Sequence, residues 1–278
     1  MRERLSLFFS SLCVVLLLPC VLTFFITGVS ACAIDRELDL EKCLPAALSS
    51  QLPKDCGTEC KKALAVLVRT NMHRQMADGK SLPKILWEYI KTQGKPSLFF
   101  GEKNYASCQG AARKTKGMLL VYQGEPVYTP YHAMSAGKTR EGAEAFGDDR
   151  FSYLLPVDSS EDRKAETYGT PVYIPLEQLP DQLEIKRRDA SGYVTELLAD
   201  GQAISGELFR QQMGLPSACF SMEKRGSTMR FYCKGQGHGV GLSQYGAACL
   251  EDAGMGYQEI LNYYFPALAI ENSSDGIA

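Results

Sequence analysis

The sequence has no surplus of basic residues: 30 Lys and Arg stand against 32 Asp and Glu over 278 residues, giving a formal net charge of −2. Nucleic-acid-binding domains usually have a strong basic surplus, so this balance argues against a nucleic-acid partner. The chain also lacks internal repeats and low-complexity tracts. Hydrophobic residues make up 45% and charged residues 22%, close to globular averages, which argues against wholesale disorder. A chain of this length can bury a substantial core.

Histidine is scarce, with three in the chain, whereas there are ten cysteines. Cys56 and Cys60 are four residues apart and share a face if the segment is helical. A zinc site there needs two more ligands, and few histidines are available to supply them. Two other interpretations remain, buried thiols or a disulfide that includes one of these cysteines. Sequence alone does not reveal which cysteines would pair.

The N-terminal region predicts attachment to a membrane. Residues 1–4 contain two arginines and precede an uncharged apolar run, residues 5–29. About 20 apolar residues cross a bilayer as a helix, so this run is long enough for a transmembrane anchor. Basic residues before the run and acidic ones after it predict a short cytoplasmic stub and an extracytoplasmic domain. The alternative is a signal sequence, because small residues precede Cys32 as in lipoprotein signals. Both interpretations predict a protein held at the cell membrane.

A linker at 30–38 precedes the expected folded domain, residues 39–272, and a frayed polar tail at 273–278 follows it. Apolar periodicity and turn residues predict helices at 59–76, 81–89, 108–116 and 257–264, with Thr58 as the N-cap of the first. Residues 39–48 are expected to form a helix or a strand that leads into one. Strands are expected at 118–122 and 126–128, which form a hairpin, and at 153–157, 171–174, 193–198 and 229–233. Helices first and strands later, without regular alternation, predict an α+β fold, a helical N-terminal part followed by a β-rich part.

Three separated stretches together resemble one family. Residues 59–70 (ECKKALAVLVRT) resemble its long helix, residues 131–139 (YHAMSAGKT) resemble one of its loops, and residues 237–247 (GHGVGLSQYGA) resemble its glycine-rich signature. The last motif is the most specific of the three. On these residues the chain is similar to the family of stage II sporulation protein D and the amidase enhancers. Order and spacing agree over roughly residues 40–268.

The resemblance implies a cell-wall protein of sporulation that acts as a lytic transglycosylase on peptidoglycan glycan strands. Such an enzyme uses one carboxylic acid, which protonates the glycosidic oxygen and then, as a carboxylate, helps the 6-hydroxyl of the sugar close a 1,6-anhydro ring. The acid must hold its proton near neutral pH, which requires a partly desolvated setting. An amidase that strips stem peptides is the partner that the resemblance implies.

Gln51 stands where the family pattern leads us to expect the catalytic Glu. An amide has no proton to give, and losing general acid catalysis typically costs about 10²–10⁴ in rate. Glu59 is a possible substitute, although a carboxylate in the first turn of a helix is also favoured by the helix dipole. Two hypotheses follow. The protein is either a weakened transglycosylase or a catalytically inactive glycan-binding scaffold that recruits or activates an amidase.

The resemblance further implies that two segments face the glycan. The expected substrate-binding residues are His132, Ser135, Gly137, Thr139, Gly237, His238, Gly239, Ser243 and Gln244. For the two histidines the alternative is a structural role with hydrogen-bonded ring nitrogens. The family can hold a metal with this first histidine and a Cys five residues earlier, but the chain has Val127 there. Valine cannot bind a metal, so zinc at His132 is disfavoured and we expect no cofactor.

Overall fold

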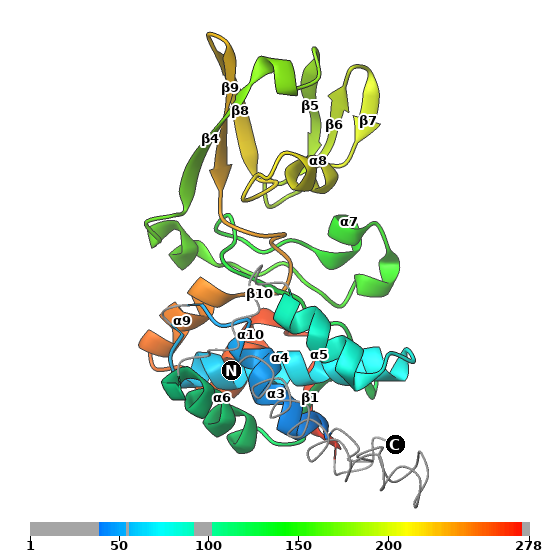
Figure 1. The fold of residues 1–278 in the computed structure, drawn as a ribbon, viewed down its shortest axis with the longest axis vertical. Coiled ribbons are helices and arrows are strands. Elements are labelled where there is room, and N and C mark those ends of the chain that lie inside the picture. Colours follow the sequence, from blue (N-terminus) through cyan, green and yellow to red (C-terminus); the bar gives the residue numbers. More distant parts are fainter. Residues whose placement is uncertain (1–38, 54–55, 92–101, 274–278) are drawn as a thin grey trace, which may run out of the picture. The chain divides into compact units, whose positions relative to one another are not determined.

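The computed structural model describes residues 39–53, 56–91 and 102–273, and the folded unit begins at Leu40. Helices come first and strands later (Figure 1), which confirms the expected mixture of helix and strand. Across those three ranges, we find no helix with both the length and the apolar character that a membrane crossing requires. The expected cytoplasmic stub, anchor and linker, residues 1–38, lie outside the described residues, as does the tail after residue 273.

The helices and strands largely follow the predicted order. The α-helices are α3 (Leu40–Ser49), α4 (Thr58–Ala77), α5 (Leu82–Lys91), α6 (Glu102–Lys114), α7 (Gly142–Phe146), α8 (Gly206–Gln212), α9 (Gln244–Asp252) and α10 (Tyr257–Tyr264). Short 3-10 helices are η1 (Asp149–Phe151), η2 (Ser160–Lys164) and η3 (Leu176–Gln178). The strands are β1 (Met118–Tyr122), β2 (Glu125–Pro126), β3 (Tyr131–His132), β4 (Gly169–Pro175), β5 (Leu183–Arg188), β6 (Val194–Ala199), β7 (Gln202–Ile204), β8 (Phe220–Arg225), β9 (Thr228–Lys234), β10 (Leu242–Ser243) and β11 (Ala269–Asn272).

Helix α4 is the centre of the helical core. Helices α3, α5, α6, α9 and α10 and strands β1 and β2 all contact it. Every residue from Ala63 to Met72 is therefore buried. A helix that is enclosed on all sides needs few polar residues on its surface. The one arginine in this stretch, Arg69, is fully buried and pairs with Glu41 of α3 at 2.7 Å.

The start of α4 depends on a tertiary contact rather than on the expected local cap. Thr58 already lies inside the helix, and Gly57 occupies the N-cap position without a capping side chain. The carboxylate of Glu251, in α9, instead accepts hydrogen bonds from the backbone N–H groups of Glu59 and Cys60, both at 3.0 Å. A Cβ atom on Gly57 would lie 2.2 Å from this carboxylate, so glycine leaves the space it needs. A carboxylate from the distant α9 therefore satisfies the helix terminus.

The strands form four small sheets. Their orders are β11-β1-β2, β10-β3, β4-β9-β8 and β5-β6-β7. The hairpin of β1 and β2 and the strands expected at 171–174, 193–198 and 229–233 are confirmed. The strand expected at 153–157 is wrong, because Tyr153 and Leu154 follow η1 as a turn. Their side chains are buried, so the apolar run reflects packing and not strand pairing.

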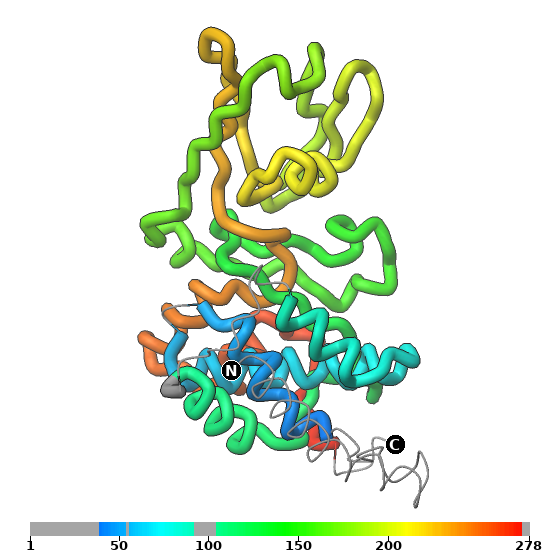
Figure 2. Tube along the Cα trace, in the orientation of Figure 1, coloured from blue at the N-terminus to red at the C-terminus, as the bar shows by residue number. Residues whose placement is uncertain are grey.

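Two large apolar clusters lie in the described chain, and a small third one consists of Ala136, Tyr193, Ala218 and Cys219. The first lies around α4, and the second lies among the later sheets, where the rings of Phe209, Phe220 and Phe231 pack together with centroids 5.6–5.7 Å apart. Figure 2 follows the chain from β9 of the second cluster to α9 beside the first. That connection, residues 235–241, contains the first five residues of the glycine-rich motif, 237–241. The motif therefore joins the two parts of the domain.

Candidate functional site

The glycine-rich connection packs directly against the loop that contains His132. Gly237 and Gly239 have φ values of 108° and 79°, a region that favours glycine. A Cβ on Gly237 would lie 2.8 Å from the Cβ of His132, and one on Gly239 would lie 2.4 Å from the ring of Tyr193. Strand β10 then pairs in parallel with β3, with Ser243 opposite His132. The fold thus brings together the two motifs that were expected to face the glycan.

His132 and His238 lie next to each other, with ring centroids 5.5 Å apart. The Nδ1 atom of His238 accepts a hydrogen bond from the N–H of Val240 at 3.1 Å, so its Nε2 must donate to the carbonyl of Tyr131, also at 3.1 Å. The Nδ1 atom of His132 lies 3.1 Å from the carbonyl of Val240 and must donate to it. The accepted hydrogen bond makes the His238 ring neutral, and the contact of His132 places a proton on its Nδ1.

The neutral rings agree with the electrostatics of the site. Burial is the largest cause that lowers the pKa of His132 to about 3 and the pKa of His238 to about 4. The neighbouring His238 lowers the pKa of His132 further. The Nε2 atom of His132 is buried and has no hydrogen-bond partner among the residues that the structure describes. It is an acceptor, because the proton of this ring is on Nδ1.

An unpartnered imidazole nitrogen is one donor of the set that a zinc ion requires. Among residues 39–53, 56–91 and 102–273, no group of three or more His, Cys, Asp and Glu side chains is placed to hold a metal ion. Val127 packs against the helical core, as an apolar side chain does. The residues present do not fit the metal site that the family pattern implies. We therefore derive no step through a metal.

Gln51 lies after α3, within reach of both motifs. Its Oε1 accepts a hydrogen bond from the hydroxyl of Tyr131 at 3.1 Å, and its backbone carbonyl accepts one from the Nε2 of Gln244 at 2.8 Å. Its own Nε2 donates to the carbonyl of Tyr89 at 3.2 Å and to the hydroxyl of Ser50 at 3.0 Å. Burial raises the pKa of Tyr131 well above its ordinary value, so its hydroxyl remains a donor. Gln51 and Gln244, both expected in the site, are in direct contact.

Glu59 has a different setting. Its carboxylate forms an ion pair with Lys62 and accepts a hydrogen bond from the backbone N–H of Tyr257, in α10, at 3.1 Å. The hydrogen bond from Lys62 is the largest cause that lowers the pKa of Glu59. A carboxyl group with a lowered pKa holds no proton near neutral pH and cannot act as a general acid. These contacts favour the structural interpretation of Glu59.

Asp162 connects two of the expected site residues, and the sequence analysis missed it. This carboxylate is fully buried in η2. Its oxygens accept hydrogen bonds from the N–H of Ser135 at 2.7 Å, the hydroxyl of Ser159 at 3.0 Å and the hydroxyl of Ser243 at 2.8 Å. Burial raises the pKa of Asp162, although these hydrogen bonds oppose the shift. Asp162 lies in a run of charged residues, 161–164, which predicts a solvent-exposed side chain. The sequence therefore does not predict that Asp162 connects Ser135 and Ser243.

The rest of the 131–139 loop is also held from within. Thr139 is buried, and its hydroxyl accepts a hydrogen bond from the N–H of Val157 at 2.8 Å. Gly137 has a φ of 99°, and a Cβ there would lie 2.3 Å from the Nε of Arg163. Arg140, which the sequence analysis did not single out, is buried and donates to the backbone carbonyl of His238 at 3.3 Å. Ser135, Gly137 and Thr139 therefore contact the supporting structure, and none contacts Gln51 among the described hydrogen bonds.

Comparison with known proteins agrees with the resemblance drawn from the motifs. No family model matches the chain. The chain is 27% identical over 261 residues to stage II sporulation protein D of Bacillus amyloliquefaciens, a match that covers 86% of this chain and 76% of that protein. Its identity to the protein of the same name from Bacillus subtilis (strain 168) is 26% with the same coverage. A match of 49% identity over 37 residues to the amidase enhancer of Bacillus subtilis (strain 168) covers 13% of this chain and 5% of that protein.

Proposed function

Because the chain belongs to the family of stage II sporulation protein D, we propose that it binds peptidoglycan glycan strands in cell-wall remodelling during sporulation. The proposed site is that of a lytic transglycosylase in which Gln51 replaces the catalytic acid. Its activity is therefore weakened or absent. The observation that carries this proposal is the hydrogen bonding of Gln51, which places an amide against Tyr131 and Gln244 at the junction of the two motifs.

The surroundings of Gln51 suit a neutral group with an acceptor on one side and a donor on the other. The Tyr131 hydroxyl donates to its oxygen, while its nitrogen donates to the Tyr89 carbonyl. A protonated carboxylic acid meets the same two requirements, since it has one carbonyl oxygen and one O–H. An ionised carboxylate would face the Tyr89 carbonyl without a proton between them. The site would therefore favour the protonated form of a Glu at this position and raise its pKa, as a general acid requires.

The decisive experiment restores the acid. Purified Gln51→Glu protein, incubated with purified peptidoglycan, is expected to release 1,6-anhydromuramyl products at about 10²-fold or more above the wild type, as measured by mass spectrometry. Gln51→Asp is the matched control. Its side chain is one methylene shorter than that of Glu, so its carboxyl group does not reach both the Tyr131 hydroxyl and the Tyr89 carbonyl. Tyr131→Phe in the Gln51→Glu background should lower the rate, because it removes the donor to the new acid.

A different result would overturn the proposal. Robust turnover by the wild type that disappears in Glu59→Gln would identify Glu59 as the acid, despite its ion pair with Lys62. If Gln51→Glu yields no products but still binds glycan strands in a pull-down assay, the binding role stands. The proposal that Gln51 replaces the catalytic acid of a transglycosylase site would then be rejected. Loss of strand binding in the wild type would reject both.

The match to an amidase enhancer favours a second role, in which this protein recruits or activates a cell-wall amidase. We propose that it does so from the outer side of the cell membrane, attached through residues 5–29. Release of stem peptides by a wall amidase, with and without the purified domain, tests the first part. An unchanged rate together with no co-purification would contradict it. Fractionation of cells that express the chain with and without residues 5–29 tests the attachment.

A further inference from the structure

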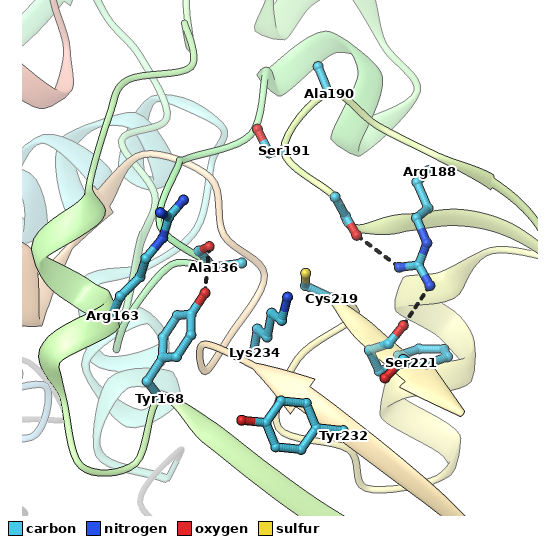
Figure 3. Close-up of a pocket in the computed structure, with 12 residues that line it drawn as sticks. Ala136, Arg163, Tyr168, Arg188, Ala190, Ser191, Cys219, Ser221, Tyr232 and Lys234 are labelled. Atoms are coloured by element: carbon cyan, nitrogen blue, oxygen red, sulfur yellow. Dashed lines mark hydrogen bonds between the residues drawn. The ribbon is translucent and has the colours of Figure 1, made fainter. Parts of the chain in front are cut away.

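A pocket separate from Gln51 lies between the 131–139 loop and the later sheets. Its volume is about 760 Å³. Three cationic side chains, Arg163, Arg188 and Lys234, line it together with the rings of Tyr168 and Tyr232, and no acidic residue is among the lining residues. Figure 3 shows Arg163 and Tyr168 on one side of the pocket and Arg188 on the other, with Lys234 between them. These side chains come from segments far apart in the sequence.

The positive charge of the pocket is not neutralised by neighbouring carboxylates. In the described part of the chain, none of the three cations has a carboxylate oxygen within 4 Å. The guanidinium of Arg188 is held by neutral groups, because it donates to the carbonyl of Gly192 at 2.9 Å and to that of Phe220 at 2.7 Å. The whole chain has a net charge of −2, so three unpaired cations in one pocket are a local feature. Such a pocket attracts anions.

The wall of this pocket is continuous with the loop that contains His132. The backbone carbonyl of Ala136 accepts a hydrogen bond from the hydroxyl of Tyr168 at 2.9 Å. The guanidinium of Arg163 lies against Gly137, where a Cβ would be only 2.3 Å away from its Nε. Glycine at this position therefore leaves room for the arginine at the pocket wall. A group bound in the pocket would touch the same loop that approaches Gln51 through Tyr131.

We propose that the pocket binds an acidic saccharide, a sugar unit that carries a carboxylate or a phosphate group. Guanidinium and ammonium groups form charge-assisted hydrogen bonds with both anions, and the planar Arg side chain can bind either through two parallel bonds. The tyrosine rings supply flat apolar surface with a hydroxyl at one end, which suits the face and edge of a sugar ring. A volume of about 760 Å³ lies within the range of small-molecule sites. That the saccharide belongs to a wall polymer rests on the proposed function.

The test measures binding of three monosaccharides to the purified domain by NMR titration at low salt. N-acetylmuramic acid carries a carboxylate, N-acetylglucosamine 6-phosphate carries a phosphate, and N-acetylglucosamine is the neutral control. At least one acidic sugar should bind, the neutral sugar should not, and binding should weaken as salt is raised. Tighter binding of the first sugar identifies a carboxylate ligand, and tighter binding of the second identifies a phosphate ligand.

Variants assign the binding to the pocket. Lys234→Gln should weaken binding about fivefold, in line with one partly exposed ionic contact, and Lys234→Glu should abolish it. Lys224→Gln is the matched control, because Lys224 is an exposed lysine on the neighbouring strand β8 and does not line the pocket. Lys234 is itself exposed, so these variants should unfold at the wild-type temperature.

Two results would overturn the inference: equal binding of the neutral sugar, or equal effects of Lys234→Gln and Lys224→Gln. Absence of binding by both acidic sugars would overturn it as well. The assay does not involve Gln51. One outcome separates the two proposals: the acidic sugar binds, glycan strands do not bind, and Gln51→Glu yields no anhydro products. The proposed function is then rejected, and the proposed binding of an acidic sugar in the pocket is supported. If strands bind and neither acidic sugar does, the pocket fails alone.

Discussion

The buried histidine pair predicts that stability falls steeply as the pH is lowered. An unfolded histidine titrates near pH 6.5. In the fold, burial lowers the pKa of His132 to about 3 and that of His238 to about 4. Between pH 6.5 and 4.5 the unfolded chain therefore takes up protons at these positions while the folded chain does not. Stability contributed by the neutral rings is full above pH 6.5 and is lost as the pH falls toward the folded pKa values.

The magnitude follows from the width of this window. Each pH unit well below 6.5 costs about 1.4 kcal/mol per histidine that stays neutral in the fold. The first unit costs less, because the unfolded histidine is only half protonated at about pH 6.5. Two units therefore cost about 2.5 kcal/mol for each ring and about 5 kcal/mol for the pair. A typical domain has about 5–15 kcal/mol of stability, so this loss is large. His73, the third histidine, also has a lowered pKa because of burial and contributes with the same sign.

The assay is urea unfolding of the domain at intervals between pH 4.5 and 7. His132→Asn can retain the donor to the Val240 carbonyl, and His238→Gln can retain the donor to the Tyr131 carbonyl. The double variant should therefore lose most of the slope and keep the smaller contribution of His73. His73→Gln is the control and should leave most of the slope in place. An unchanged slope in the double variant would refute the reasoning, because it would show that His132 and His238 do not contribute to the pH dependence.

Three further substitutions test contacts between distant segments. Asp162→Ala should lower stability by about 1–3 kcal/mol in thermal unfolding, because it leaves the buried N–H of Ser135 without an acceptor. Asp162→Asn should cost less, and equal losses would contradict this account. Glu251→Ala should cost about 1–2 kcal/mol in urea unfolding by removing the acceptor at the start of α4, and an unchanged midpoint would contradict this role. Gly239→Ala should cost at least about 2 kcal/mol more stability than Gly79→Ala in the same assay. Both glycines have a positive φ, but only a Cβ on Gly239 would meet a ring, at 2.4 Å. Similar losses for the two variants would show that backbone strain alone sets the cost.

The sequence by itself determined most of the local structure. Apolar spacing predicted α4, α10 and the β1–β2 hairpin, because period and turn residues act between near neighbours in the chain. The same reasoning failed at 153–157, where buried apolar side chains pack in a turn. Motif resemblance predicted that the loop at 131–139 and the glycine-rich segment face one site, and the fold packs the two segments against each other. It also drew attention to Gln51, which lies beside Tyr131 and Gln244.

Only the tertiary structure decided which polar groups support the site and which remain available to a ligand. The carboxylate of Asp162 meets Ser243, 81 positions away, and Glu251 caps a helix that begins 193 positions before it. The three cations of the pocket come from η2, β5 and β9. Burial and pairing of a charge depend on side chains that folding brings close from distant parts of the chain. Local sequence patterns therefore do not predict which charges are buried or paired.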